Sequence, residues 1–315
     1  MFVIAGEALI DFIATGVGSF RPVAGGAPFN FARALALQGV ATGYANPLSS
    51  DHFGTLLNSS LTASGAIHLG PIIAQPTSLA IVSKSADGQP SYQFYREGVA
   101  DRALSLQHLV GNFSSTTLGF HSGGLALVPP DHALIVHALG SARGKGILCT
   151  LDVNMRMRVA HSMSVAPNVY RDAARAAMAG ADIVKVSDED LIHLGLTGAP
   201  NNSARTLLGE NCKLIVVTLG ASGAWALSAD DEIFLPAEVV TVVDTVGAGD
   251  CFFAGFVVSL IHDHEFKTLR RQAPARSILE RALRHATRCA AINITREGCQ
   301  PPTWAEASQT QGSSE

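Results

Sequence analysis

The sequence predicts an α/β protein with a mostly parallel sheet and a second, smaller β-sheet. From about Ala133 onward, expected helices and strands alternate along the chain, which is the order typical of a parallel sheet covered by helices. Two strand-like stretches, 9–24 and 77–96, interrupt this order and predict the smaller sheet. The length of 315 residues and the hydrophobic fraction of 47% fit a globular chain with a large core.

The first third of the chain is expected to contain one buried strand, the smaller sheet and one helix. Residues 2–5 form a short apolar run before Gly6, a pattern that predicts a buried strand. The alanine-rich stretch 27–37 follows two glycines and predicts a helix. Within 77–96, the pair Asp87-Gly88 predicts the turn of a hairpin. This hairpin and the strand pair in 9–24 would make a small β lid outside the main sheet.

The remainder of the chain supplies most of the expected main sheet. Helices are expected at 131–143, 169–179 and 188–194, and strands at 146–152, 183–186 and 214–218. Short strands are expected in 224–243, a long apolar helix from Asp250, and a final helix over 276–293. The predicted division is an α/β core (1–10, 25–76 and 101–306), a lid (11–24 and 77–100) and a flexible polar tail (307–315).

The composition of the chain argues against some classes of partner and indicates a cellular compartment. A net charge of −4 and a pI near 6.2 give no basic surface for nucleic acid or for an anionic membrane, so neither is expected as a partner. The five cysteines include no Cys-x-x-Cys pair and are expected to be free thiols in a reducing compartment. The start of the chain has no basic signal region, and the apolar stretch 251–261 is too short to cross a bilayer. These features predict a cytoplasmic protein.

The strongest motif is Asp244-Thr245-Val246-Gly247-Ala248-Gly249-Asp250, which is followed by an apolar run. Small residues allow close approach of the backbone to a ligand, and free N–H groups at a helix N-terminus attract anions such as a phosphoryl group. Asp250 stands where a carboxylate could take a proton from an attacking hydroxyl. Taken alone, the same residue could merely cap the helix.

A second motif is Ala24-Gly25-Gly26-Ala27-Pro28-Phe29-Asn30. Paired glycines before a helix permit close approach to a ligand, and the amide of Asn30 can both donate and accept hydrogen bonds, as sugar recognition requires. In isolation, this motif could also be a tight turn with a helix cap.

Taken together, the two loops resemble the two signatures of the ribokinase-like (pfkB) carbohydrate kinase family, in the same order and separated by most of the chain. Further segments that resemble this family are Gly6-Glu7-Ala8-Leu9-Ile10-Asp11, Asp152-Val153-Asn154-Met155-Arg156, Lys185-Val186-Ser187-Asp188-Glu189-Asp190, Thr218-Leu219-Gly220-Ala221-Ser222-Gly223 and 291–299. Two departures are Ser187, where ribokinases have Asn, and Asp190, which is shorter than the usual Glu.

The resemblance implies a three-layer α/β fold with a β lid, and an ATP-dependent phosphotransferase that acts on a sugar hydroxyl. It implies that Asp250 is the base and that the amides of Gly247, Ala248 and Gly249 bind the phosphoryl charge. The implied sugar contacts are Asp11, Gly25, Gly26, Asn30, Arg96 and Arg156. The implied nucleotide contacts are Lys185, Ser187, Thr218, Gly220, Gly223 and Asn293. Asp190 is implied in organising Mg²⁺, and Asp244 in binding a monovalent cation such as K⁺.

Several motifs together look most like bacterial fructokinases, which would make fructose 6-phosphate the product. The alternatives are 2-keto-3-deoxygluconate, whose carboxylate could pair with Arg96 or Arg156, and then ribose or a nucleoside. A sugar-sensing relative without activity is a further alternative, although such a protein would be expected to lose Asp250 or the amide loop. A homodimer formed through the lid strands is expected by analogy alone.

Overall fold

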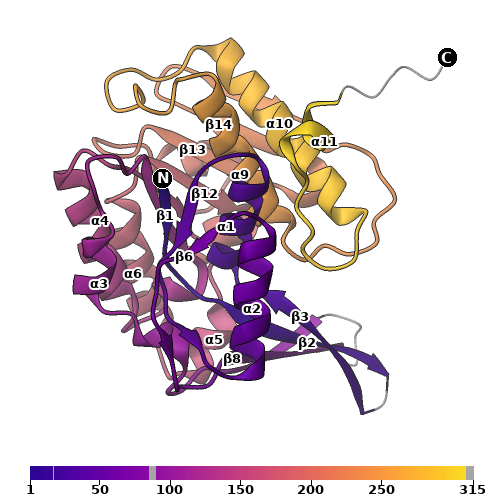
Figure 1. Cartoon of the computed structure of the whole chain (residues 1–315). Helices are drawn as coiled ribbons and strands as arrows, with labels where there is room; N and C mark the ends of the chain where they lie inside the picture. Colours follow the sequence, from indigo (N-terminus) through magenta and orange to yellow (C-terminus); the bar gives the residue numbers. More distant parts are fainter. Residues whose placement is uncertain (17, 85–89, 310–315) are drawn as a thin grey trace.

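A twisted sheet with helices on both faces forms the centre of the protein, whose computed structural model describes residues 1–16, 18–84 and 90–309 (Figure 1). In the described residues, the strands of this sheet lie in the order β15 (Glu232–Leu235), β14 (Ala224–Leu227), β13 (Leu214–Thr218), β12 (Ile183–Ser187), β11 (Leu148–Asp152), β10 (Gly119–Gly123), β1 (Phe2–Ile4), β4 (Thr42–Tyr44) and β6 (Ile67–His68). The pairs from β13 to β6 are parallel, whereas β14 and β15 are antiparallel additions at one edge.

Alternate side chains of the sheet enter two separate cores. Phe2 and Ile4 pack into the core beneath α1, α9 and α10, while Val3 enters the core on the side of α4 and α6. In chain order, the helices are α1 (Ala27–Leu37), α2 (His52–Ala63), α3 (Leu106–Gly111), α4 (His132–Gly144), α5 (Met157–Ser162), α6 (Pro167–Met178), α7 (Asp188–His193), α8 (Pro200–Arg205), α9 (Ala248–His262), α10 (Arg276–Ile294) and α11 (Trp304–Ser308). The predicted three-layer α/β architecture is thereby confirmed.

Helix α9 is buried on almost every side, because it lies between the sheet, α1 and α10 (Figure 1). Its residues from Asp250 to Leu260 are all buried, which explains why the sequence is apolar all round and not on one stripe. A helix held this firmly gives its N-terminus a fixed position at the sheet.

A smaller sheet projects from the edge of the main domain (Figure 1). Its strands lie in the order β3 (Ser19–Gly25), β2 (Leu9–Gly16), β8 (Ser78–Lys84) and β9 (Pro90–Tyr95). The central pair β2–β8 is parallel and the two outer pairs are antiparallel. The strands fall within the stretches from which the lid was predicted. The expected turn at Asp87-Gly88 lies outside the described residues.

The structure differs from the sequence expectations in three places. No strand follows β15 in 236–243, where Pro236 interrupts the run and Val239, Val242 and Val243 are exposed. Helix α11 includes Ala307 and Ser308, which had been assigned to the tail, because the Thr303 hydroxyl and the Glu306 carboxylate cap it reciprocally. The short strands β5 (Leu48–Ser49) and β7 (Ile72–Ile73) form a separate parallel pair that had not been expected.

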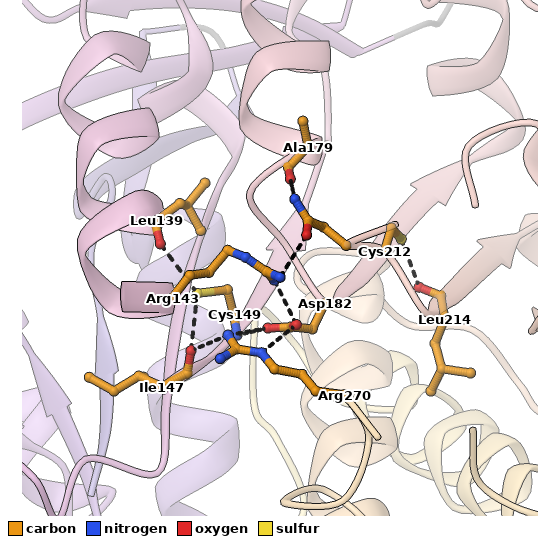
Figure 2. A network of polar contacts seen from close by, with 10 residues as sticks. Leu139, Arg143, Ile147, Cys149, Ala179, Asp182, Cys212, Leu214 and Arg270 are labelled. Carbon is orange, nitrogen blue, oxygen red and sulfur yellow. Dashed lines mark hydrogen bonds and ion pairs between the residues drawn. The ribbon is translucent and has the colours of Figure 1, made fainter. Parts of the chain in front are cut away.

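The amino ends of the parallel strands are held together by Asp182, directly before β12 (Figure 2). This fully buried carboxylate accepts hydrogen bonds from Arg143 of α4 at 2.7 Å and from Arg270 at 2.8 and 2.9 Å. It also accepts one from the backbone N–H of Cys149 at 2.7 Å. The contacts join one helix, two strands and the connection between α9 and α10. In the described chain, no helix is long and apolar enough to span a membrane.

Candidate active site

The loop 244–247 and the first turn of α9 lie at the carboxyl ends of the parallel strands, the edge at which open α/β sheets bind ligands. Gly247 is the N-cap of α9 and has a φ of +72°, a conformation that favours glycine. A Cβ at this position would also collide with the Sγ of Cys299. The N–H groups of Gly247 and Gly249 have no acceptor within the described residues, while that of Ala248 donates to Thr245 at 3.2 Å. Two of the three predicted amides are therefore free to bind an anion.

Two side chains attach this loop to the C-terminal part of the chain. Asp244 accepts hydrogen bonds from the N–H of Val246 at 3.0 Å and of Gly298 at 2.9 Å. Asn293, at the end of α10, donates to the carbonyl of Val246 at 2.8 Å. The structure thus places Asp244, predicted to bind a monovalent cation, and Asn293, predicted to contact nucleotide, as supports of the amide loop.

Asp250 lies in the first turn of α9, with an exposed fraction of 7%. Its Oδ2 accepts a hydrogen bond of 2.9 Å from the Nδ2 of Asn30, so the two sequence motifs meet although 220 residues separate them. Burial, reinforced by the charge of Asp152, raises the pKa of Asp250 to about 7. A carboxylate with a pKa near neutrality is suited to accept and release a proton.

A buried ion pair lies beneath the amide loop. The Nζ of Lys185 is 2.9 Å from both carboxylate oxygens of Asp152, its register partner on the neighbouring strand. A Cβ on Gly249 would be 3.3 Å from this Nζ, so Lys185 lies directly against the first turn of α9. Asp152 was not among the predicted site residues, although it is the first residue of the segment Asp152-Val153-Asn154-Met155-Arg156 that resembles the family.

Asp190 and Ser187 form a capping box at the start of α7. The Oδ2 of Asp190 accepts from the N–H and hydroxyl of Ser187 at 2.8 and 2.9 Å, and its Oδ1 accepts from the N–H of Met155 at 2.6 Å. Within the described residues, no group of three or more His, Cys, Asp or Glu side chains could hold a metal.

The predicted nucleotide glycines lie in the turn after β13, where Thr218 ends the strand. Gly220 has a φ of +55°, and Gly223 a φ of +121°. A Cβ at Gly223 would collide with the carbonyl of Leu235, so close packing of the backbone requires glycine there. The exposed Val239 follows this contact by a few residues and provides an apolar surface that the sequence had assigned to a strand.

The paired glycines shape the other side of the site. A Cβ on Gly25 would collide with the carboxylate of Asp11, and one on Gly26 with the carbonyl of Glu7. Burial raises the pKa of Asp11 to about 7, although the Arg156 charge lowers it. Arg156 is exposed, and its positive charge lowers the pKa of Asp11 and also that of Asp250.

Arg96 lies at the base of the small sheet and is paired with a protein carboxylate. Its Nη2 is 2.9 Å from the Oδ2 of Asp101, and both side chains are buried. The Nε of Arg96 has no partner within the described residues. Neither Asp101 nor the nearby Glu7 was among the predicted site residues. A sequence signal existed only for Glu7, which stands in the segment resembling the family's first strand.

This arrangement of free amides at a helix N-terminus beside a buried carboxylate of raised pKa suits the transfer of an anionic group to a hydroxyl. The family model "pfkB family carbohydrate kinase" matches residues 1–306. The chain belongs to this family and is an ATP-dependent sugar kinase.

Named relatives and a solved structure agree with this assignment. The chain is 37% identical to a fructokinase of Rhizobium leguminosarum bv. trifolii over 292 residues, which cover 90% of this chain and 86% of the relative. It is 31% identical to fructokinase-2 of Oryza sativa subsp. japonica, over 96% of this chain and 91% of the relative. The crystal structure of a Xylella fastidiosa fructokinase with bound ATP superposes with a TM-score of 0.86 at 27% identity, covering 97% of this chain and 96% of that one. The ribokinase-like fold is confirmed.

Proposed function

We propose that the protein transfers the γ-phosphoryl group of ATP to the primary 6-hydroxyl of D-fructose and releases fructose 6-phosphate. The observation that carries the proposal is the position of Asp250, which is buried beside free amides and bonded to Asn30 of the glycine motif. The similarity to fructokinases supports the choice of fructose. The keto acid 2-keto-3-deoxygluconate remains the first alternative, because Arg156 offers an exposed cation near the site.

The mechanism that we propose begins with sugar bound by Asp11, Asn30 and the glycines Gly25 and Gly26, with Arg96 and Arg156 at its margin. Asp250 takes the proton of the attacking hydroxyl, because its carboxylate lies next to Asn30 and its pKa is near neutrality. The amides of Gly247 and Gly249, aided by the dipole of α9, stabilise the charge that develops on the transferred group. The ammonium of Lys185 lies against this turn and adds to that stabilisation.

On the nucleotide side, we propose contacts from Ser187, Thr218, Gly220 and Gly223, and support of the loop by Asn293. Mg²⁺ that accompanies ATP would neutralise part of the phosphate charge. The carboxylate oxygens of Asp190 and Asp244 already accept backbone hydrogen bonds, so we place both residues as supports through which Mg²⁺ and a monovalent ion such as K⁺ would be organised indirectly.

The small sheet is proposed to close over the sugar, which would exclude water as a competing acceptor. The enzyme should then hydrolyse ATP far more slowly without sugar than it turns over with sugar. A homodimer through this sheet and a cytoplasmic location are further parts of the proposal. The five cysteines, all free and buried, support a reducing compartment.

The test is ADP production with Mg-ATP and a panel of fructose, 2-keto-3-deoxygluconate, ribose, glucose and adenosine. A strong preference for fructose, measured as kcat/KM, supports the proposal. A preference for the keto acid would retain Asp250 and the amide loop and would make the arginines partners of a carboxylate. No turnover on the panel, with ATP still bound, would contradict a kinase role and favour a sugar sensor.

A further inference from the structure

Glu7 is a buried carboxylate that the mechanism above does not use. It follows β1 and has an exposed fraction of 4%. Its Oε1 accepts a hydrogen bond of 3.2 Å from the N–H of Ala27, at the start of α1. Its Oε2 is buried and forms no hydrogen bond within the described residues, although the backbone N–H groups of Leu125 and of Glu7 itself also lower the pKa of this carboxyl group. An acceptor left in this condition is costly in a folded protein and requires an explanation.

Glu7 packs so closely that its carboxylate can hardly move away from this position. Gly124 follows the end of β10 with a φ of +58°, and a Cβ there would be 2.5 Å from the Oε1 of Glu7. A side chain at 124 would therefore displace the carboxylate. The neighbouring backbone of Gly6 is fixed as well, by Asn46 at 2.8 Å and by the hydroxyl of Tyr44 at 2.6 Å.

Arg96 supplies the complementary unpaired atom. Its Nη2 is committed to Asp101, but its Nε is buried without a partner in the described part of the chain. Burial raises the pKa of Glu7 to about 6, and Arg96 is close enough for its guanidinium to lower that pKa in part. Yet the described structure contains no ion pair between them. The side chains of Glu7 and Arg96 therefore interact electrostatically, but they form no hydrogen bond with each other.

A hydroxyl group satisfies both atoms at once, because it donates one hydrogen bond and accepts others. We propose that Glu7 is a sugar-binding residue, and that one hydroxyl of the sugar donates to its Oε2 while accepting from the Nε of Arg96. The inference rests on the proposed sugar kinase function and extends it to a contact between the main domain and the base of the small sheet.

The bridging hydroxyl differs from the one that Asp250 deprotonates. The carboxylate of Glu7 accepts a hydrogen bond from Ala27 at the start of α1. Asn30, which donates to Asp250, lies one helical turn further along the same helix. One turn spans about 5 Å, which is comparable to the distance between hydroxyls at separated positions of a sugar. The Oδ1 of Asn30 is also buried without a partner and can accept a hydroxyl between these two points.

The test compares the wild type with Glu7→Gln, which preserves the shape and one acceptor but adds a donor where the hydroxyl must donate. We expect KM for fructose to rise about 10- to 100-fold, while kcat and KM for ATP stay within about threefold, since the contact is made equally in the bound and transition states. An unchanged KM for fructose would overturn the proposal. If Glu7→Gln does not fold, Glu7→Asp, which retracts the carboxylate by one methylene, is expected to show the same change and carries the test.

Combining the Glu7→Gln variant with deoxy analogues of fructose distinguishes a direct contact with the sugar from a structural role of Glu7. Fructose is compared with its 1-deoxy, 3-deoxy and 4-deoxy forms and with 2,5-anhydromannitol, which lacks the anomeric hydroxyl. One analogue should lose at least tenfold in kcat/KM with the wild type and no more than about twofold with Glu7→Gln. Equal losses in both proteins for every analogue would show that Glu7 does not touch the sugar.

Asp51→Asn provides a matched control, because Asp51 also has a carboxylate near the base of the small sheet, and this carboxylate accepts hydrogen bonds from Thr77 and from the N–H of Gly54. It should lower the melting temperature and leave the analogue ratios unchanged. A wild type that phosphorylates a different sugar would refute the choice of fructose alone. The same cycle would then be run with the hydroxyls of that sugar, so the two proposals fail separately.

Discussion

Two buried aspartates at opposite ends of the same sheet have opposite surroundings. Asp182, at the amino ends of the strands, accepts four hydrogen bonds, three of them from guanidinium groups (Figure 2). Among the described residues, Asp250, at the carboxyl ends, accepts a single side-chain hydrogen bond, from Asn30. The first carboxylate is saturated and joins parts of the fold. The second keeps lone pairs free and has a pKa raised to about 7, so its environment makes it reactive at the expense of stability.

The same substitution at the two positions should separate these roles. Asp250→Asn removes the base, so kcat with Mg-ATP and sugar should fall about 10²- to 10⁴-fold without loss of folding or ATP binding. Steady-state kinetics and nucleotide titration measure the two effects. A variant with a near-normal kcat would show that Asp250 is not the base.

Asp182→Asn should have the reverse effect. It leaves two arginines without their carboxylate, and because both are partly exposed we expect a loss of about 2–4 kcal/mol in the free energy of unfolding. The kcat per folded molecule should remain that of the wild type. Urea unfolding and kinetics on the folded fraction measure this. Unchanged stability would contradict the role given to the Asp182 contacts.

The amide loop should be sensitive to one methyl group. Gly247→Ala forces a side chain into a left-handed conformation and against Cys299, which should misplace the loop amides and lower kcat about 10²-fold. The double variant Gly247→Ala/Cys299→Ala relieves the collision but not the conformation and should recover only part of the rate. Full activity in the single variant would refute the requirement for glycine.

The pH dependence should follow the ionisation of Asp250. Since its pKa is raised to about 7, kcat at saturating sugar should fall about tenfold for each pH unit below this value and level off above it. The raised pKa also means that the folded state favours the protonated form, so its stability contribution is present at low pH and is lost as pH rises through about 7. Asp250→Asn should therefore raise the melting temperature more at pH 8 than at pH 5. A flat rate profile between pH 5 and 8 would count against this assignment.

The smallest effect is expected at Arg270. Arg270→Lys keeps the charge but loses the two-point contact with Asp182, which should cost about 1 kcal/mol of stability. Thermal unfolding of Arg270→Lys and Asp182→Asn, measured in parallel, shows how much of the stability due to the Asp182 contacts comes from Arg270. A loss as large as that of Asp182→Asn would mean that Arg143 contributes nothing.

The sequence predicted best those elements whose ends carry local signals. Helix α1 has the predicted bounds because Gly26 precedes it and Pro28 stands in its first turn, and β13 is an apolar run that ends at Thr218. By contrast, Lys185 and Asp152 pair only because β11 and β12 adopt a specific register, which no local pattern encodes. The pairing of Arg96 with Asp101 likewise depends on how the small sheet joins the main domain. The exposed valines of 236–243 have the composition of a strand, but no neighbouring strand pairs with them.

The attachment of the amide loop to Asn293 and Gly298 has a consequence for protein synthesis. A nascent chain that has emerged as far as α9 already contains every residue of both motifs, but the residues that hold the loop are still to be made. Under the proposed mechanism, a chain whose synthesis stops before residue 293 would contain Asp250 but would lack the side chain that holds the amide loop.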